Sequence, residues 1–297
     1  MFFVDLRTFV VSVFFTMRKP RRVILLSSCA ALLATGVYAQ IWTGPDRMWG
    51  GFRGEPPRFA TPALRDGTFH FCRLMYDSDR QEAGGQGWRT DYPGADINFS
   101  VRFAELTKAA VGRDQDDEPE YFVVRSSEDD DLFNCGFVTM EDAGTAALSD
   151  ADVLQLRKYL LKGGFIWNDD FWGPLAWDQW VGEISRVLPP AQYPIVDIPA
   201  SHPIFHTQFN VKEVIQVPAI SQWRRMGGGT SERGELSRDV HTRGIFDDKG
   251  RLMVLMTHNT DISDTWEREG EDKEYFYRFS PDGYAIAIDV MLYVMTH

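Results

Sequence analysis

The feature that most constrains the fold is a repeated alternation between short apolar runs and segments of helical periodicity, from about residue 68 to the C-terminus. The apolar runs predict strands at Thr68–Tyr76, Tyr121–Arg125, Gly136–Met140, Phe165–Asn168 and Leu252–Met256. The periodic segments predict helices at Ala95–Ala110, Ser149–Gly163, Leu175–Leu188 and Pro281–His297. Since strands joined through helices pair in parallel, the pattern predicts one three-layer α/β domain, with a mainly parallel sheet between helices.

Composition narrows the class of protein. Apolar residues make up 44% of the chain and charged residues 25%, which is typical of a globular protein and not of a disordered one. The 43 acidic residues outnumber the 31 basic ones, so the net charge is −12. Because nucleic-acid binding needs basic side chains that displace counterions from phosphates, we expect no nucleic-acid partner.

The N-terminal segment has the organisation of a secretory signal peptide. The basic stretch Met17–Arg22 precedes an apolar run, Val23–Val37, and Ala39 follows at a position that a signal peptidase can read. We therefore predict a signal peptide at residues 1–39 with Met17 as the true start, and an uncleaved membrane anchor is the alternative. The mature protein is expected to be exported, periplasmic or secreted, with no further membrane span.

Two regions are predicted after the signal peptide. Residues 40–67 are rich in Gly, Pro and Arg without periodicity, which indicates an extended lead-in. The α/β domain is expected at residues 68–297. Within it, Arg225–Arg243 is rich in Gly, Arg and Glu and is predicted to be an exposed loop.

Only two cysteines, Cys72 and Cys135, lie outside the predicted signal peptide. An oxidising compartment would permit a disulfide between them. Both lie in apolar, strand-like runs, where a buried free thiol is the more common state. The sequence therefore favours free thiols and leaves a disulfide as the alternative.

Polar side chains follow four of the predicted strands, at the points where these strands end. In chain order they are Asp77 and Asp79, Glu141 and Asp142, Asp169 and Asp170, and then His258, Asn259, Asp261, Asp264 and Glu267. Ligands of parallel α/β sheets bind beyond the carboxyl ends of the strands. We therefore expect these side chains to lie along one edge of the sheet.

Several carboxylates in one cleft repel each other and raise each other's pKa unless a cation lies among them. One interpretation is therefore a divalent metal ion held by Asp261 and Asp264. Asp169, Asp170 and His258 are then the candidate catalytic groups. The alternative is structural, because Asp and Asn are common after strands, where they cap helices and form turns.

The candidate binding residues are the remaining side chains of this edge together with one tryptophan. They are Asp77, Glu141, Asn259, Glu267 and Trp172, whose ring could stack on a sugar or a base. The sequence contains no Gly-x-Ser-x-Gly elbow, no phosphate-binding Gly-x-x-x-x-Gly-Lys loop and no dinucleotide fingerprint. No complete catalytic signature therefore supports these candidates.

Several stretches together resemble the bacterial proteins grouped as domain of unknown function 4159, from about Thr68 to His297. They are Tyr76-Asp77, Thr90-Asp91-Tyr92-Pro93-Gly94-Ala95-Asp96-Ile97-Asn98-Phe99, Gly163-Gly164-Phe165-Ile166-Trp167-Asn168-Asp169-Asp170, His202-Pro203-Ile204-Phe205 and His258-Asn259-Thr260-Asp261-Ile262-Ser263-Asp264-Thr265-Trp266-Glu267.

The resemblance implies a flavodoxin-like sheet similar to that of class I glutamine amidotransferase-like proteins. Such amidotransferases carry a cysteine nucleophile after a central strand, whereas the matching turn here is Asn168-Asp169-Asp170. The resemblance therefore implies the architecture without the amidase chemistry, and no established activity comes with the family.

Two functions fit these observations. The first is a binding or scaffold protein of the cell envelope, whose sheet edge recognises a small ligand or a partner protein. The alternative is a hydrolase in which a carboxylate or a metal-bound water attacks the substrate at an acidic cleft. The lack of a complete catalytic signature favours the binding function. A divalent metal ion is the one cofactor that the carboxylates suggest.

Overall fold

The computed structural model describes residues 55–60, 67–126 and 131–297. The predicted signal peptide at residues 1–39 and most of the predicted lead-in at residues 40–67 lie outside the described residues. Within the described part, no helix combines the length and the apolar content needed to cross a membrane.

A seven-stranded sheet forms the centre of the domain, in the order β2-β1-β3-β4-β7-β6-β5. The first five strands in this order are parallel: β2 (Tyr121–Arg125), β1 (Phe71–Met75), β3 (Phe137–Glu141), β4 (Phe165–Phe171) and β7 (Leu252–His258). The last two are antiparallel: β6 (His241–Phe246) and β5 (Ile195–Asp197). The predicted single α/β domain with a mainly parallel sheet is confirmed.

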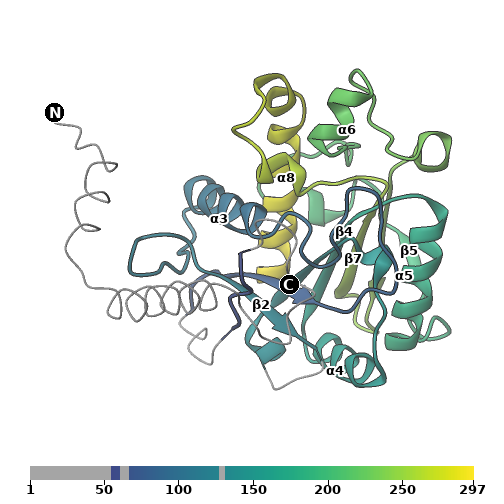
Figure 1. Ribbon diagram of the computed structural model, residues 1–297. Helices are drawn as coiled ribbons and strands as arrows, with labels where there is room; N and C mark the ends of the chain where they lie inside the picture. Colours follow the sequence, from purple (N-terminus) through teal and green to yellow (C-terminus); the bar gives the residue numbers. More distant parts are fainter. Residues whose placement is uncertain (1–54, 61–66, 127–130) are drawn as a thin grey trace, which may run out of the picture. The chain divides into compact units, whose positions relative to one another are not determined.

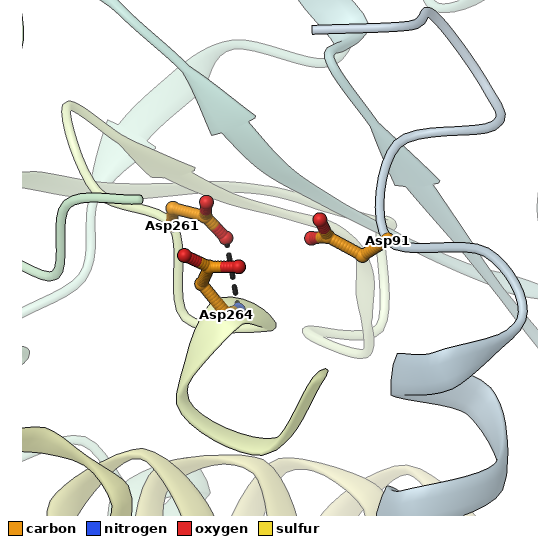
Figure 2. Close-up of side chains that lie close together, drawn as sticks. All are labelled: Asp91, Asp261 and Asp264. Atoms are coloured by element: carbon orange, nitrogen blue, oxygen red, sulfur yellow. Dashed lines mark hydrogen bonds between the residues drawn. The ribbon is translucent and has the colours of Figure 1, made fainter. Parts of the chain in front are cut away.

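Four helices flank the sheet (Figure 1). They are α3 (Gly94–Thr107), α4 (Asp150–Leu161), α5 (Gly173–Val187) and α8 (Lys273–Thr296). The short helices α6 (Ile220–Arg225) and α7 (Asp264–Glu267) lie in loops, and Figure 2 shows the first residue of α7 close to Asp261. Short 3-10 helices complete the connections: η3 (Asp131–Asn134), η4 (Ala143–Thr145), η5 (Pro203–Phe205) and η6 (Gly234–Ser237).

An apolar cluster joins α3 and α8 to one face of the sheet. Phe99 of α3 and Tyr275 of α8 belong to it, together with the strand residues Phe71, Phe137 and Phe165. Helix α4 begins where the sequence predicts, because Ser149 accepts from the backbone N–H of Asp152 while the Asp152 carboxylate accepts in return from that of Ser149. The cap of α4 therefore follows from local pattern.

Strands β5 and β6 are absent from the sequence prediction, and the start of helix α8 differs from it. Strand β6 contains His241, Thr242 and Arg243, which have no apolar pattern, and it exists because it pairs antiparallel with β7. The predicted exposed loop at Arg225–Arg243 therefore ends inside the sheet. Helix α8 begins at Lys273, well before Pro281, since Asp272 caps it and the core buries its first turns.

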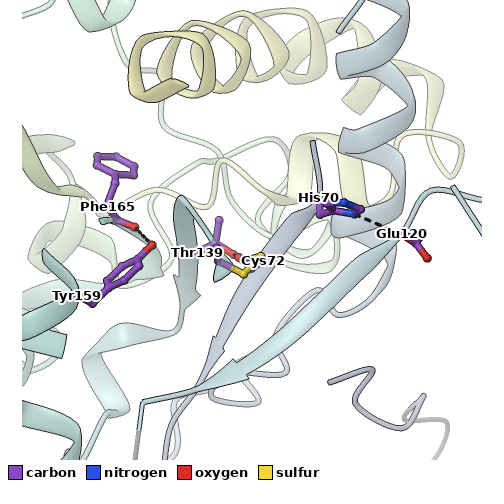
Figure 3. Close-up of a disulfide and its surroundings, with 7 residues drawn as sticks. His70, Cys72, Glu120, Thr139, Tyr159 and Phe165 are labelled. Atoms are coloured by element: carbon purple, nitrogen blue, oxygen red, sulfur yellow. Dashed lines mark hydrogen bonds and ion pairs between the residues drawn. A yellow bond between two sulfur atoms is a disulfide. The ribbon is translucent and has the colours of Figure 1, made fainter. Parts of the chain in front are cut away.

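Cys72 of β1 and Cys135, just before β3, form a disulfide (Figure 3). The expectation of free thiols is therefore wrong. Their Cα atoms lie 6.2 Å apart, within the range that a disulfide spans. Sequence spacing could not reveal this distance, because it follows from the pairing of β1 with β3.

Replacing both cysteines, Cys72→Ala with Cys135→Ala, is expected to lower the free energy of unfolding by about 2–4 kcal/mol. The bridge joins residues 63 positions apart, so it restricts the unfolded chain over a long loop. Urea unfolding of the double variant and of the oxidised protein measures the difference. Equal midpoints would show that the bridge does not contribute to stability.

Candidate functional site

A cavity of about 240 Å³ opens at the carboxyl ends of the parallel strands. Eight carboxylates line it, from the segments that follow β1, β3 and β7 and from β4 itself, together with one from the loop before β6: Glu82, Asp91, Asp142, Asp170, Glu232, Asp261, Asp264 and Glu267. Three arginines also line it: Arg225, Arg233 and Arg268. The predicted gathering of acidic side chains at this edge is therefore present.

Asp91, Asp261 and Asp264 form the tightest group in this cavity. Each offers a carboxylate oxygen, and these oxygens all lie within 4.8 Å of one another. Figure 2 shows the three side chains converging from two separate segments of the chain. Asp261 and Asp264 are 2% exposed, so neither is a solvated surface residue. We call these three residues the aspartate triad.

Ser263 and the backbone hold the triad in place. The Ser263 hydroxyl lies 2.7 Å from Asp91 Oδ2 and 3.2 Å from Asp261 Oδ1. The backbone N–H of Asp264 also donates to Asp261 Oδ1, at 3.0 Å, and that of Ile220 donates to Asp264 Oδ2, at 2.8 Å. The loop after β7 therefore orients two of the carboxylates and reaches the third.

Burial and mutual repulsion disfavour ionised carboxylates in the triad. Burial, and then the charge of Glu267, raises the pKa of Asp91 to about 7. Burial also raises the pKa values of Asp261 and Asp264 well above their ordinary range, and neighbouring carboxylates add to the rise. A bound cation would replace the protons that these groups otherwise retain.

Arg268 is the cationic side chain nearest to the triad among the described ion pairs. Its Nε lies 3.9 Å from Asp264 Oδ1 but 2.5 Å from Glu267 Oε2. It also reaches Glu271, and its side chain is 42% exposed. Arg268 therefore neutralises Glu267 more effectively than it neutralises the triad.

Two of the sequence candidates, Asp169 and Glu141, lie beneath the cavity and do not line it. Asp169 accepts hydrogen bonds from the Thr257 hydroxyl, at 2.5 Å, and from the Ser263 backbone, at 3.0 Å. Glu141 Oε2 lies 3.2 Å from the Ser263 hydroxyl. Burial raises the pKa of Asp169 to about 7, and it also raises the pKa of Glu141 well above its ordinary range. Both residues therefore support Ser263 and the loop that carries Asp261 and Asp264.

Asp170 and Trp172 reach the cavity, as does Glu267. The indole Nε1 of Trp172 donates to Asp170 Oδ1 at 2.9 Å. Asp169 and Asp170 belong to strand β4 and not to a turn after it, which corrects the predicted end of that strand. Asp170 has a φ of 49°, and this left-handed conformation turns its side chain away from the regular strand alternation.

His258, Asn259 and Asp77 do not line the cavity. The ring of His258 packs at a tilt against those of Phe171 and Trp177, and burial lowers its pKa to about 4. Asn259 accepts from the backbone N–H of Gly173 at 2.8 Å, and Asp77 is exposed. The structure therefore separates the predicted histidine from the carboxylates with which the sequence grouped it.

Sequence reasoning did not identify Asp91 as a site residue. Asp91 lies well beyond the end of β1, so its position along the chain does not mark it as a strand-end residue. The available signal was the Thr90–Phe99 stretch, which carries part of the family resemblance. Glu232, Arg225 and Arg233 were also missed, because they lie in the segment predicted to be an exposed loop.

Comparison with known proteins identifies the family of the chain. No curated protein matches the sequence. The family model described as "Domain of unknown function (DUF4159)" matches residues 70–295, which span the sheet, its helices and every residue of the aspartate triad. The chain therefore belongs to the DUF4159 family.

Proposed function

We propose that this is an exported, cation-dependent binding protein of the cell envelope, whose cavity holds a divalent cation and, through it, a small ligand or a partner protein. The observation that carries this proposal is the aspartate triad, with its three carboxylate oxygens within 4.8 Å of one another. Carboxylate oxygens are the ligands that Mg²⁺, Ca²⁺ and Mn²⁺ prefer.

The arrangement of the sheet supports this place for a ligand. The parallel strands follow the order β2-β1-β3-β4-β7, which is the order of a flavodoxin-like sheet and reverses direction between β1 and β3. Asp91 follows β1 and Asp142 follows β3, so the cavity lies at the edge where ligands of such sheets bind. We infer from this order a likeness to glutamine amidotransferase-like folds.

A metal-dependent hydrolase is the second candidate function. Asp170 favours it, because this carboxylate lines the same cavity as the triad and burial raises its pKa well above the ordinary value. A group of this kind can exchange a proton with a water or a leaving group beside the cation. Amidase chemistry is not proposed, since β4 carries Asn168, Asp169 and Asp170 where amidotransferases carry the cysteine.

Thermal unfolding of the chelator-stripped protein tests the cation site. At a hundred times its dissociation constant, a cation that binds only the folded state adds about 2.7 kcal/mol and raises the melting temperature by several degrees. We expect such a shift with one of Ca²⁺, Mg²⁺ or Mn²⁺ and its loss in Asp261→Asn. The amide oxygen of Asn can still accept from the backbone of Asp264, so the local turn is preserved.

The metal-free Asp261→Asn protein is expected to melt at a higher temperature than the metal-free parent at pH 8, because one repelling buried carboxylate is gone. Asp248→Asn is the matched control, since Asp248 is an exposed aspartate in the turn between β6 and β7. It should leave the cation-induced shift unchanged. An absence of any shift in the parent protein would refute the cation site.

A further inference from the structure

Ion pairs neutralise only part of the acidic charge in the cavity. Among the described residues, three of the eight lining carboxylates lie within 3.2 Å of an arginine nitrogen, whereas Asp264 lies 3.9 Å from Arg268, which is closer to Glu267. The pairs are Glu82 with Arg80 at 2.5 Å, Glu232 with Arg233 at 3.2 Å, and Glu267 with Arg268 at 2.5 Å. Five carboxylates remain: the aspartate triad, Asp142 and Asp170.

Arg225 is the cavity-lining arginine that takes part in none of these ion pairs. Its guanidinium makes no hydrogen bond or ion pair with any described residue. With all five carboxylates ionised, one divalent cation at the triad together with Arg225 would still leave two negative charges in the cavity. A second divalent cation would cancel them, and Asp142 and Asp170 are the carboxylates that the first ion does not use.

One carboxylate oxygen of Asp142 has no hydrogen-bond partner in the described part of the chain. The residue is 1% exposed, and its Oδ2 accepts from the backbone N–H of Gly87 at 2.9 Å. Its Oδ1 is buried and has no hydrogen-bond partner among the described residues. A buried carboxylate oxygen without a partner is costly, and Asp142 lines the cavity, so this oxygen points to a ligand that supplies positive charge.

Asp170 lies at the same edge of the sheet as Asp142. Glu141 of β3 pairs with Asp169 of the parallel neighbour β4, and Asp142 and Asp170 are the residues that follow these two, so both lie at the same edge of the sheet. The charge of Asp142 also contributes to the raised pKa of Asp170, as expected for two carboxylates that face the same cavity. Trp172 occupies Oδ1 of Asp170, and no described group donates to its Oδ2. Both residues therefore offer one carboxylate oxygen to the cavity.

We propose that Asp142 and Asp170 bind a second divalent cation in this cavity, beside the cation of the aspartate triad. The proposal rests on the proposed function, because it assumes that the triad holds the first ion. Two carboxylates suffice for such a site, since Mg²⁺ and similar hard cations keep several water molecules when one or two carboxylates bind them. Shared cavities of this kind are known for two-metal sites.

Metal counting tests this proposal directly. The protein is stripped with chelator, equilibrated by dialysis against Mn²⁺, and analysed for bound manganese per chain. We expect two ions in the parent protein and one in Asp142→Asn or in Asp170→Asn. Asparagine is the appropriate substitution because Asp142 and Asp170 have φ values of 50° and 49°, a conformation that Asn tolerates better than most residues.

The outcomes separate this proposal from the proposed function. One ion per chain in the parent protein would overturn the second site and leave the triad site standing. No ion would refute the cation site itself. Two ions retained in both variants would also overturn the assignment to Asp142 and Asp170. Circular dichroism checks that each variant folds, and Asp248→Asn should retain both ions.

Discussion

The metal-free protein is expected to lose several kcal/mol of stability as the pH is raised from 5 to 8. Burial is the main cause that raises the pKa values of Asp142 and Asp169 to about 7. In the unfolded chain these groups titrate near pH 4, so between pH 4 and 7 the folded state binds more protons than the unfolded state. Their stabilising contribution is complete below about pH 4 and is lost as the pH rises through 7.

Each such group changes the free energy of unfolding by about 1.4 kcal/mol per pH unit within this window. His258 acts in the opposite direction, because burial lowers its pKa to about 4 in the folded protein. As the pH rises from about 4 to about 6.5, the unfolded chain still binds the histidine proton that the folded protein has lost, so the free energy of unfolding increases. One histidine does not offset several carboxylates, since Glu141, Asp170 and the triad also have raised pKa values.

Urea unfolding in the presence of chelator at pH 5, 6, 7 and 8 measures this dependence. Asp142→Asn should give a flatter profile, because the amide does not titrate, whereas Asp248→Asn should follow the parent protein. Added cation should also flatten the profile, since metal binding strengthens as the carboxylates lose their protons. Stability that increases with pH in the metal-free protein would contradict the raised pKa values.

Arg73→Met is expected to destabilise the protein by about 3–5 kcal/mol. Arg73 and Asp96 are both fully buried, with Nη2 2.5 Å from Asp96 Oδ1, and removal of one partner leaves the other as an uncompensated charge in the core. The double variant Arg73→Met with Asp96→Leu should recover most of this loss, because it removes both charges and keeps apolar volume.

Arg102→Met is the matched control on helix α3. Arg102 pairs with Glu105 and Glu269, but its side chain is 38% exposed, so we expect a loss below about 1 kcal/mol. Urea midpoints at one pH compare the two single variants and the double variant. Equal losses in Arg73→Met and Arg102→Met would show that the buried Arg73–Asp96 pair contributes no more to the free energy of unfolding than the exposed pairs of Arg102.

Arg73→Met is also expected to weaken cation binding at the triad. Arg73 Nη1 donates to the backbone carbonyls of Thr90, at 2.6 Å, and Trp88, at 3.3 Å. These bonds hold the loop that presents Asp91, although Arg73 does not line the cavity. Arg73 is therefore a positioning residue for the proposed cation site, and its effect on affinity should exceed that of Arg102→Met.

Local pattern predicts the parts of this fold that depend on neighbours in the chain. The capping box at Ser149 and the apolar run of β3 are recognised without a structure, because their hydrogen bonds and periodicities involve residues a few positions apart. Strand β6 is not recognised, since its polar residues become a strand only through pairing with β7. The Cys72–Cys135 disulfide depends on the β1–β3 pairing in the same way.

The sequence by itself determined that the chain forms one α/β domain and that carboxylates collect at the carboxyl ends of its parallel strands. Tertiary structure decided which of them meet. It brought Asp91 from a distant loop to Asp261 and Asp264, left Asp142 Oδ1 without a hydrogen-bond partner among the described residues, and placed His258 among aromatic rings. The physical reason is that periodicity is a property of adjacent residues, whereas the distance between two carboxylates depends on strand order and on the path of the loops.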